Sequence, residues 1–178
     1  TRQLHYSVSN ENSIDIVLFL NGIPVVSMEL KNQFTGQDTD NAIHQYKFDR
    51  ASKDTIFEFK NRVLVHFAVD LYNVFMTTRL QGANTYFLPF NQGSNGSGNV
   101  GGKGNPQNPD GYQTAYLWEK VLAKDSLLEI LHKYMHLQVE IKEDKNGNKM
   151  RKETMIFPRY HQLDVVTRLL ADVKANGA

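Results

Sequence analysis

The chain has 178 residues, of which 40% are hydrophobic and 11% aromatic, and its formal net charge is +1. This is enough for one packed domain, or for one domain and part of another, and the near-neutral charge argues mildly against a protein that coats nucleic acid. The absence of cysteine excludes disulfide bonds and thiolate metal sites, while the lack of a signal peptide or of a run near the ~20 apolar residues of a membrane helix favours the cytoplasm.

The first strong pattern along the chain is a β-hairpin centred on Asn21-Gly22. Residues 2–9 alternate apolar and polar side chains, as a half-buried strand does, and two β-branched apolar runs follow at 14–20 and 24–31. Asn-Gly between two such runs is a preferred hairpin turn. The pattern therefore predicts a strand followed by a tight hairpin.

Three polar residues of this hairpin form a candidate site. Folding at the turn brings Asp15 and Glu29 toward the same end, and Lys31 shares a face with Glu29 because alternate residues of a strand do. Carboxylate oxygens suit a divalent metal, and hydrolysis needs a cation near the attacking water. Ordinary polar residues at strand ends are the alternative, which the spacing alone favours. The apolar neighbours of both acids favour a metal partner, because an unpaired buried carboxylate is costly.

The middle of the chain predicts a mixed sheet with helices on its faces. Asp38 or Thr39 can cap a helix that runs to about Arg50. His66 lies in an apolar strand and is expected to be a satisfied sheet residue, so no zinc site is assigned. The strands expected after the helix are 63–69, 74–78 and 85–88.

Residues 91–110 are rich in glycine and asparagine and have little to bury. A flexible or bridging loop is the favoured interpretation, because such a segment cannot offset the entropy of ordering a core. A phosphate-binding loop is the alternative, since glycine amides can surround an anion. Lys103 is followed by Gly104, however, so the Gly-Lys-Ser/Thr ending of a nucleotide-binding P-loop is absent.

Helices and a second hairpin are expected in the C-terminal third. Helical spacing is found around Trp118, which we expect in the core, and again after an N-cap at Asp125-Ser126. A hairpin joins 137–142 to 154–157, and a helix starts at Pro158. Its apolar side would be formed by Val165, Val166, Leu169, Leu170 and Val173.

The segment from Asp15 to Asn32 resembles the nuclease domain of the restriction (motor, R) subunit of type I restriction-modification enzymes. The similarity covers the acid, the apolar run, Asn-Gly-Ile-Pro and Glu-Leu-Lys-Asn. It continues along most of the chain, at 62–70, 76–80, 87–91, 111–118 and 157–162.

This resemblance implies an α/β, restriction-endonuclease-like PD-(D/E)xK fold followed by a helicase-type translocase. The endonuclease domain would then be 1–155, with its N-terminal part missing, and 156–178 would begin the motor domain. Gln162 resembles the glutamine with which helicases recognise adenine. No P-loop follows it, so ATP would serve only the full-length enzyme.

The resemblance also implies roles for the candidate residues. Asp15 and Glu29 would bind Mg²⁺, and Lys31 would polarise the water and stabilise the developing charge. Gln45 fits the first position of the family's Gln-x-x-x-Tyr motif, although Asp49 stands where the tyrosine is expected. Tyr46, Lys47 and Arg50 are candidate contacts to the DNA backbone, or else belong to a solvated helix face.

The function implied is a Mg²⁺-dependent endonuclease that cleaves double-stranded DNA in an ATP-driven complex, a type I site-specific deoxyribonuclease. Its partners would be DNA and the modification and specificity subunits, with no membrane involved. The alternative is a catalytically silent docking or regulatory module of the same complex. A stand-alone nuclease is disfavoured by the helicase-like segment at 158–162.

Overall fold

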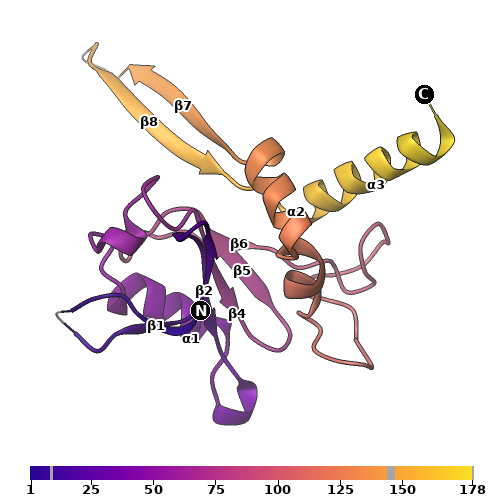
Figure 1. Ribbon diagram of the computed structural model, residues 1–178, viewed down its shortest axis with the longest axis horizontal. Helices are drawn as coiled ribbons and strands as arrows, with labels where there is room; N and C mark the ends of the chain where they lie inside the picture. The colour runs from indigo at the N-terminus through magenta and orange to yellow at the C-terminus, as the bar shows by residue number, and fades with distance from the viewer. Residues whose placement is uncertain (9, 144–146, 178) are drawn as a thin grey trace.

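The computed structural model describes residues 1–8, 10–143 and 147–177 (Figure 1). In this part of the chain six strands form one sheet in the order β1-β2-β3-β4-β5-β6. β3 and β4 run parallel, and all other neighbours are antiparallel. The strands are β1 (Arg2–His5), β2 (Ser13–Leu20), β3 (Ile23–Leu30), β4 (Val65–Val69), β5 (Val74–Thr77) and β6 (Leu88–Pro89).

The predicted hairpin is formed by β2 and β3. Asn21 and Gly22 both have positive φ angles, 49° and 82°, which the favoured two-residue hairpin turn requires. The register shifts between Leu18 and Phe19. On the side of this shift away from the turn, Ile16 pairs with Met28. Asp15 precedes this pair on β2 and Glu29 follows it on β3, so both acids lie at the end of the hairpin away from the turn.

The segment between β3 and β4 is largely helical. It contains α1 (Thr39–His44), in which Asp38 caps the N-terminus by accepting hydrogen bonds from the backbone of Asp40 and Asn41. The helix was expected to run regularly to about residue 50, but after His44 it widens into a π-helical turn, η2 (Gln45–Asp49). Short 3₁₀ turns precede and follow these helices, η1 (Gln33–Thr35) and η3 (Thr55–Phe57).

Helices cover both faces of the sheet. On one face α1 and η2 pack against residues of β2 and β4, with Ala42 and Tyr46 in the shared core. On the other face lie η4 (Leu117–Val121), α2 (Lys124–Glu129) and η5 (Ile130–Tyr134), together with the start of α3. The predicted α/β class, a mixed central sheet flanked by helices, is therefore confirmed. None of the described helices combines the length and hydropathy needed to cross a bilayer.

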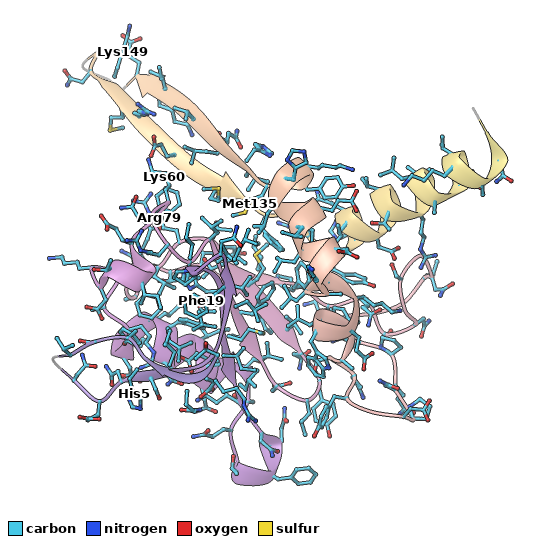
Figure 2. The ribbon with its side chains drawn as sticks, in the orientation of Figure 1. His5, Phe19, Lys60, Arg79, Met135 and Lys149 are labelled. Atoms are coloured by element: carbon cyan, nitrogen blue, oxygen red, sulfur yellow. The ribbon has the colours of Figure 1, made fainter. Side chains whose placement is uncertain are left out.

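Two elements extend from α2 on opposite sides (Figure 1). One is the second predicted hairpin, β7 (His136–Glu143) with β8 (Lys149–Ile156), and the other is α3 (Tyr160–Asn176). The hairpin is attached at its base, where Thr78 Oγ1 donates to Met155 O over 2.8 Å. Lys60 pairs with Glu153 of β8, and Figure 2 shows Lys60 beside that strand and Lys149 near the hairpin tip.

Several expectations about local burial are corrected. Trp118 is 42% exposed rather than in the core, because Leu117 and Val121 occupy the buried positions of the π-helical turn η4. The N-cap of α2 is Ala123, not the Asp125-Ser126 pair. The strand expected at 85–88 is found as β6 at Leu88–Pro89, since Thr85 hydrogen-bonds within a turn to Gly82.

The apolar side predicted for α3 is not buried. Only Tyr160 and Leu163 of this helix are in the core, together with Phe157 before it. These residues, at the predicted domain boundary, pack in the same core as the sheet. The exposed apolar residues are Val165, Val166, Leu169, Leu170 and Val173.

The glycine- and asparagine-rich segment has a defined path at its base. Asn105 is buried and its amide donates to Tyr72 O and Asn91 Oδ1, while its Oδ1 accepts from the Gln92 backbone. Arg168 of α3 donates to Ser97 O. The loop is therefore closed by side-chain amides, and its flexibility and phosphate binding stay predictions.

Candidate active site

The structure brings Asp15 and Glu29 to the same end of the β2–β3 hairpin. Asp15 is half-buried and accepts two hydrogen bonds, from Leu30 N at 2.7 Å and from Gln3 Nε2 at 2.9 Å. Gln3 has a positive φ of 48°, a strained conformation for a residue other than glycine. The backbone of β3 and the side chain of β1 thus fix the Asp15 carboxylate at the sheet edge.

Glu29 is fully buried, and its two oxygens are in different environments. Oε1 accepts from Arg50 Nε at 2.9 Å and lies 2.8 Å from Arg50 Nη2. Among the described residues, Oε2 has no hydrogen-bond partner. Burial raises the pKa of Glu29 to about 7, partly offset by the charge of Arg50, while the nearby charge of Asp15 raises it further. This carboxylate is therefore half satisfied and close to a second acid.

Lys31 is held beside the same helix turn. Its ammonium donates to Gln45 Oε1 over 2.6 Å, and its backbone N–H donates to Val69 O. Gln45 begins η2, and Arg50 follows the end of it. The π-helical turn thus supplies a partner to Lys31 at one end and a partner to Glu29 at the other, which brings Glu29, Lys31 and Gln45 together on one face.

Two of the three candidate DNA contacts, Tyr46 and Arg50, are buried in the structure. Tyr46 is fully buried, with its hydroxyl 2.9 Å from Ser27 Oγ, and the Arg50 side chain is also buried, against Glu29. The physical reason is that η2 directs both side chains toward the sheet. Lys47 is half-buried, and its contact with DNA stays a prediction.

Sequence reasoning missed the ion pair of Glu29 and a buried polar network beside it. Ser27 Oγ lies 2.8 Å from His66 Nδ1 as well as close to Tyr46, which confirms that His66 is a satisfied sheet residue. Burial lowers the pKa of His66 to about 3. The sequence did contain a signal for this ion pair. A buried Glu29 needs a partner, and Arg50 is a cation at the end of the next predicted helix.

A comparison with protein families matches this region. The family model described as type I restriction enzyme R protein N terminus covers residues 1–85. Residues 1–85 belong to this family. The segment contains Asp15, Glu29, Lys31 and Gln45, whereas α2, the β7–β8 hairpin and α3 lie outside it. No curated protein and no solved structure matched the chain.

Asp15 and Glu29 are carboxylates of the kind that Mg²⁺ uses as ligands. Within the described residues there is no cluster of three or more His, Cys, Asp or Glu side chains suited to a metal. Mg²⁺ commonly uses only one or two carboxylates and fills its other positions with water and substrate phosphate. Asp15 and the unpartnered, buried Oε2 of Glu29 are the two carboxylate groups that this end of the hairpin offers.

Gln162 lies far along the chain from these residues, outside the part that matches the R-subunit family. It is exposed in the first turn of α3, and its Oε1 accepts a hydrogen bond from Arg159 N over 3.0 Å. This contact caps the start of the helix. Nucleotide recognition by Gln162 stays a prediction.

Proposed function

We propose that this chain is the Mg²⁺-dependent endonuclease module of a type I restriction enzyme R subunit, with a restriction-endonuclease-like PD-(D/E)xK fold. It would cut double-stranded DNA within an ATP-driven complex that includes the modification and specificity subunits. The observation that carries the proposal is the buried Glu29 with Oε2 unpartnered, close enough to Asp15 and Lys31 for the charges of both to act on it.

Each residue has a defined task in this proposal. Asp15 and Glu29 would hold the ion, which when bound acts as a Lewis acid on the phosphate and lowers the pKa of water. Lys31 places an ammonium group where negative charge develops on the phosphate during attack. Gln45 fixes the direction of that ammonium through their 2.6 Å hydrogen bond. In this arrangement the carboxylates would hold the metal ion, and the ammonium of Lys31 would stabilise the negative charge on the phosphate. Phosphodiester hydrolysis needs both.

One observation favours the alternative, a catalytically silent docking or regulatory module. The ion pair with Arg50 gives Glu29 a structural partner in the protein itself. Buried acids paired in this way also occur purely for structure. In a nuclease Oε2 of Glu29 would bind the metal ion, whereas in a silent module it would not. Measurements of metal binding and of DNA cleavage therefore distinguish the two functions.

The test uses the full-length subunit in its assembled complex. We expect Asp15→Asn, Glu29→Gln and Lys31→Ala each to abolish DNA cleavage while ATP hydrolysis and translocation continue. Calorimetric titration with Mn²⁺ should show a binding site in the parental protein that Asp15→Asn weakens. Parental cleavage rates in the Lys31→Ala complex would reject the nuclease assignment and favour the silent module.

A further inference from the structure

We propose that Arg50 is a built-in counter-ion of the candidate metal site, and that it makes loading of the divalent ion depend on bound DNA. The proposal rests on the proposed function, because it takes Asp15 and Glu29 as the metal ligands. It assigns Arg50 a positioning role toward Glu29 rather than a contact with DNA.

The guanidinium of Arg50 is fixed from several sides. Two of its nitrogens contact the same oxygen of Glu29, Oε1. Nη2 also donates to the Ser13 carbonyl at the start of β2 over 2.7 Å, and the group lies 5.9 Å from the centre of the Tyr6 ring. Moving it away would leave buried donors unpaired, which is costly. Arg50 therefore stays beside Glu29 when a metal enters.

This fixed position leaves Glu29 one oxygen for a metal. Because both contacts from Arg50 go to Oε1, the unpartnered Oε2 is the atom that can meet an ion. Glu29 is therefore expected to bind through a single oxygen. A carboxylate that binds through one oxygen supplies fewer ligand atoms than one that binds through two. The ion then needs more oxygen ligands from water or from a bound phosphate.

The charges around Glu29 also cancel. Arg50 contacts Glu29 directly, and Lys31 is held by Gln45 beside it, so two cationic side chains accompany the carboxyl groups of Glu29 and Asp15. A divalent ion entering this group meets no excess of negative charge, and ligand charge count is a main determinant of affinity for such ions. A DNA phosphate supplies both the missing charge and further oxygen ligands. The site should consequently load fully only when DNA is present.

Two substitutions separate the charge of Arg50 from its geometry. Arg50→Gln removes the charge and keeps an N–H donor for Oε1, whereas Arg50→Lys keeps the charge and loses the pair of donors on one oxygen. Lys53→Gln is the matched control, because it removes one positive charge from an exposed position between η2 and η3. Thermal unfolding of each variant establishes that the protein is folded.

The experiment is calorimetric titration of the assembled, nucleotide-free complex with Mn²⁺, with and without a phosphorothioate DNA duplex that resists cleavage. The part of the signal lost in Asp15→Asn defines this site. We expect the parental protein to bind Mn²⁺ at least tenfold more tightly with DNA. Without DNA, Arg50→Gln should bind at least tenfold more tightly than the parent, while Arg50→Lys and Lys53→Gln match the parent.

Equal parental affinity with and without DNA would overturn the inference, as would a folded Arg50→Gln that binds no more tightly than the parent. A gain in Arg50→Lys equal to that in Arg50→Gln would also overturn it, because charge would then not be the cause. Should Arg50→Gln not fold, the DNA dependence of the parental protein decides alone. Mn²⁺ binding that Asp15→Asn leaves unchanged with DNA present would instead reject the proposed function.

Discussion

Lys31 and Gln45 are joined by a 2.6 Å hydrogen bond from the ammonium to the side-chain carbonyl oxygen. The two residues come from different elements, since Lys31 directly follows β3 and Gln45 is the first residue of the π-helical turn η2. The bond removes much of the freedom of a long lysine side chain. The ammonium is thus held on the face of the sheet that carries Glu29.

The role of this bond can be tested with two substitutions of similar size. Gln45→Leu removes the acceptor, so the ammonium of Lys31 loses its direction, and cleavage by the full complex should fall roughly tenfold, as expected for one hydrogen bond to a charged group. Gln45→Glu keeps an acceptor and should retain more activity than Gln45→Leu. Single-turnover cleavage rates measure both. A Gln45→Leu rate equal to the parental one would show that the bond does not position Lys31.

The pKa of Glu29 predicts how stability depends on pH in the metal-free protein. The folded-state pKa is about 7, above the ordinary value of 4.5, so the folded protein holds this proton more tightly than the unfolded chain does. The contribution to stability is therefore complete below about pH 4.5 and is lost as the pH rises through about 7. Urea unfolding of the parental protein should show this loss, and Glu29→Gln should show a flatter profile.

Added Mn²⁺ at high concentration should offset part of this loss of stability. A ligand that binds only the folded state raises its stability by mass action, and ionised Glu29 is the form that binds metal. We expect Mn²⁺ to stabilise the parental protein more at about pH 8 than at about pH 5, and to have little effect on Glu29→Gln. Equal stabilisation of both proteins would indicate that the ion binds elsewhere.

The sequence predicted the hairpin and its turn because local chemistry determines them. Asn21-Gly22 sets the turn, so Asp15 could be placed near Glu29 in advance, whereas the register shift between Leu18 and Phe19 was not predicted. The helix was also predicted, together with its cap at Asp38. Each of these features depends on residues that are close in the sequence.

The role of Arg50 could not be predicted in the same way. A regular helix through Arg50 was expected, and it would have pointed side chains in other directions than the observed π-helical turn does. Trp118 was misplaced for a related reason, since η4 is also π-helical. Helical periodicity assumes a regular 3.6-residue turn, and both of these segments depart from it.

His66 predicts a pH dependence of the opposite sign. Burial lowers its folded-state pKa to about 3, from an ordinary value of 6.5, so the unfolded chain takes up the proton first. Its contribution is present above about pH 6.5 and is lost as the pH falls toward about 3, at up to about 1.4 kcal/mol per pH unit. His66→Gln should have a shallower decline in stability with acid than the parent. His5→Gln, which removes an exposed histidine, should decline as the parent does.

The start of α3 should be part of the same cooperative unit as the sheet, although the sequence assigned it to the next domain. Phe157 is buried and makes edge contacts with Phe67, at 5.9 Å between ring centres, and tilted contacts with Phe90 at 6.0 Å. Phe157→Ala should therefore lower the free energy of unfolding by about 3–5 kcal/mol. Leu169→Ala, on the exposed side of α3, should change it by less than about 0.5 kcal/mol. Urea unfolding of this chain, monitored by circular dichroism, measures the free energy of unfolding of both variants. Equally small changes in Phe157→Ala and Leu169→Ala would show that α3 is not part of the cooperative unit formed by the sheet.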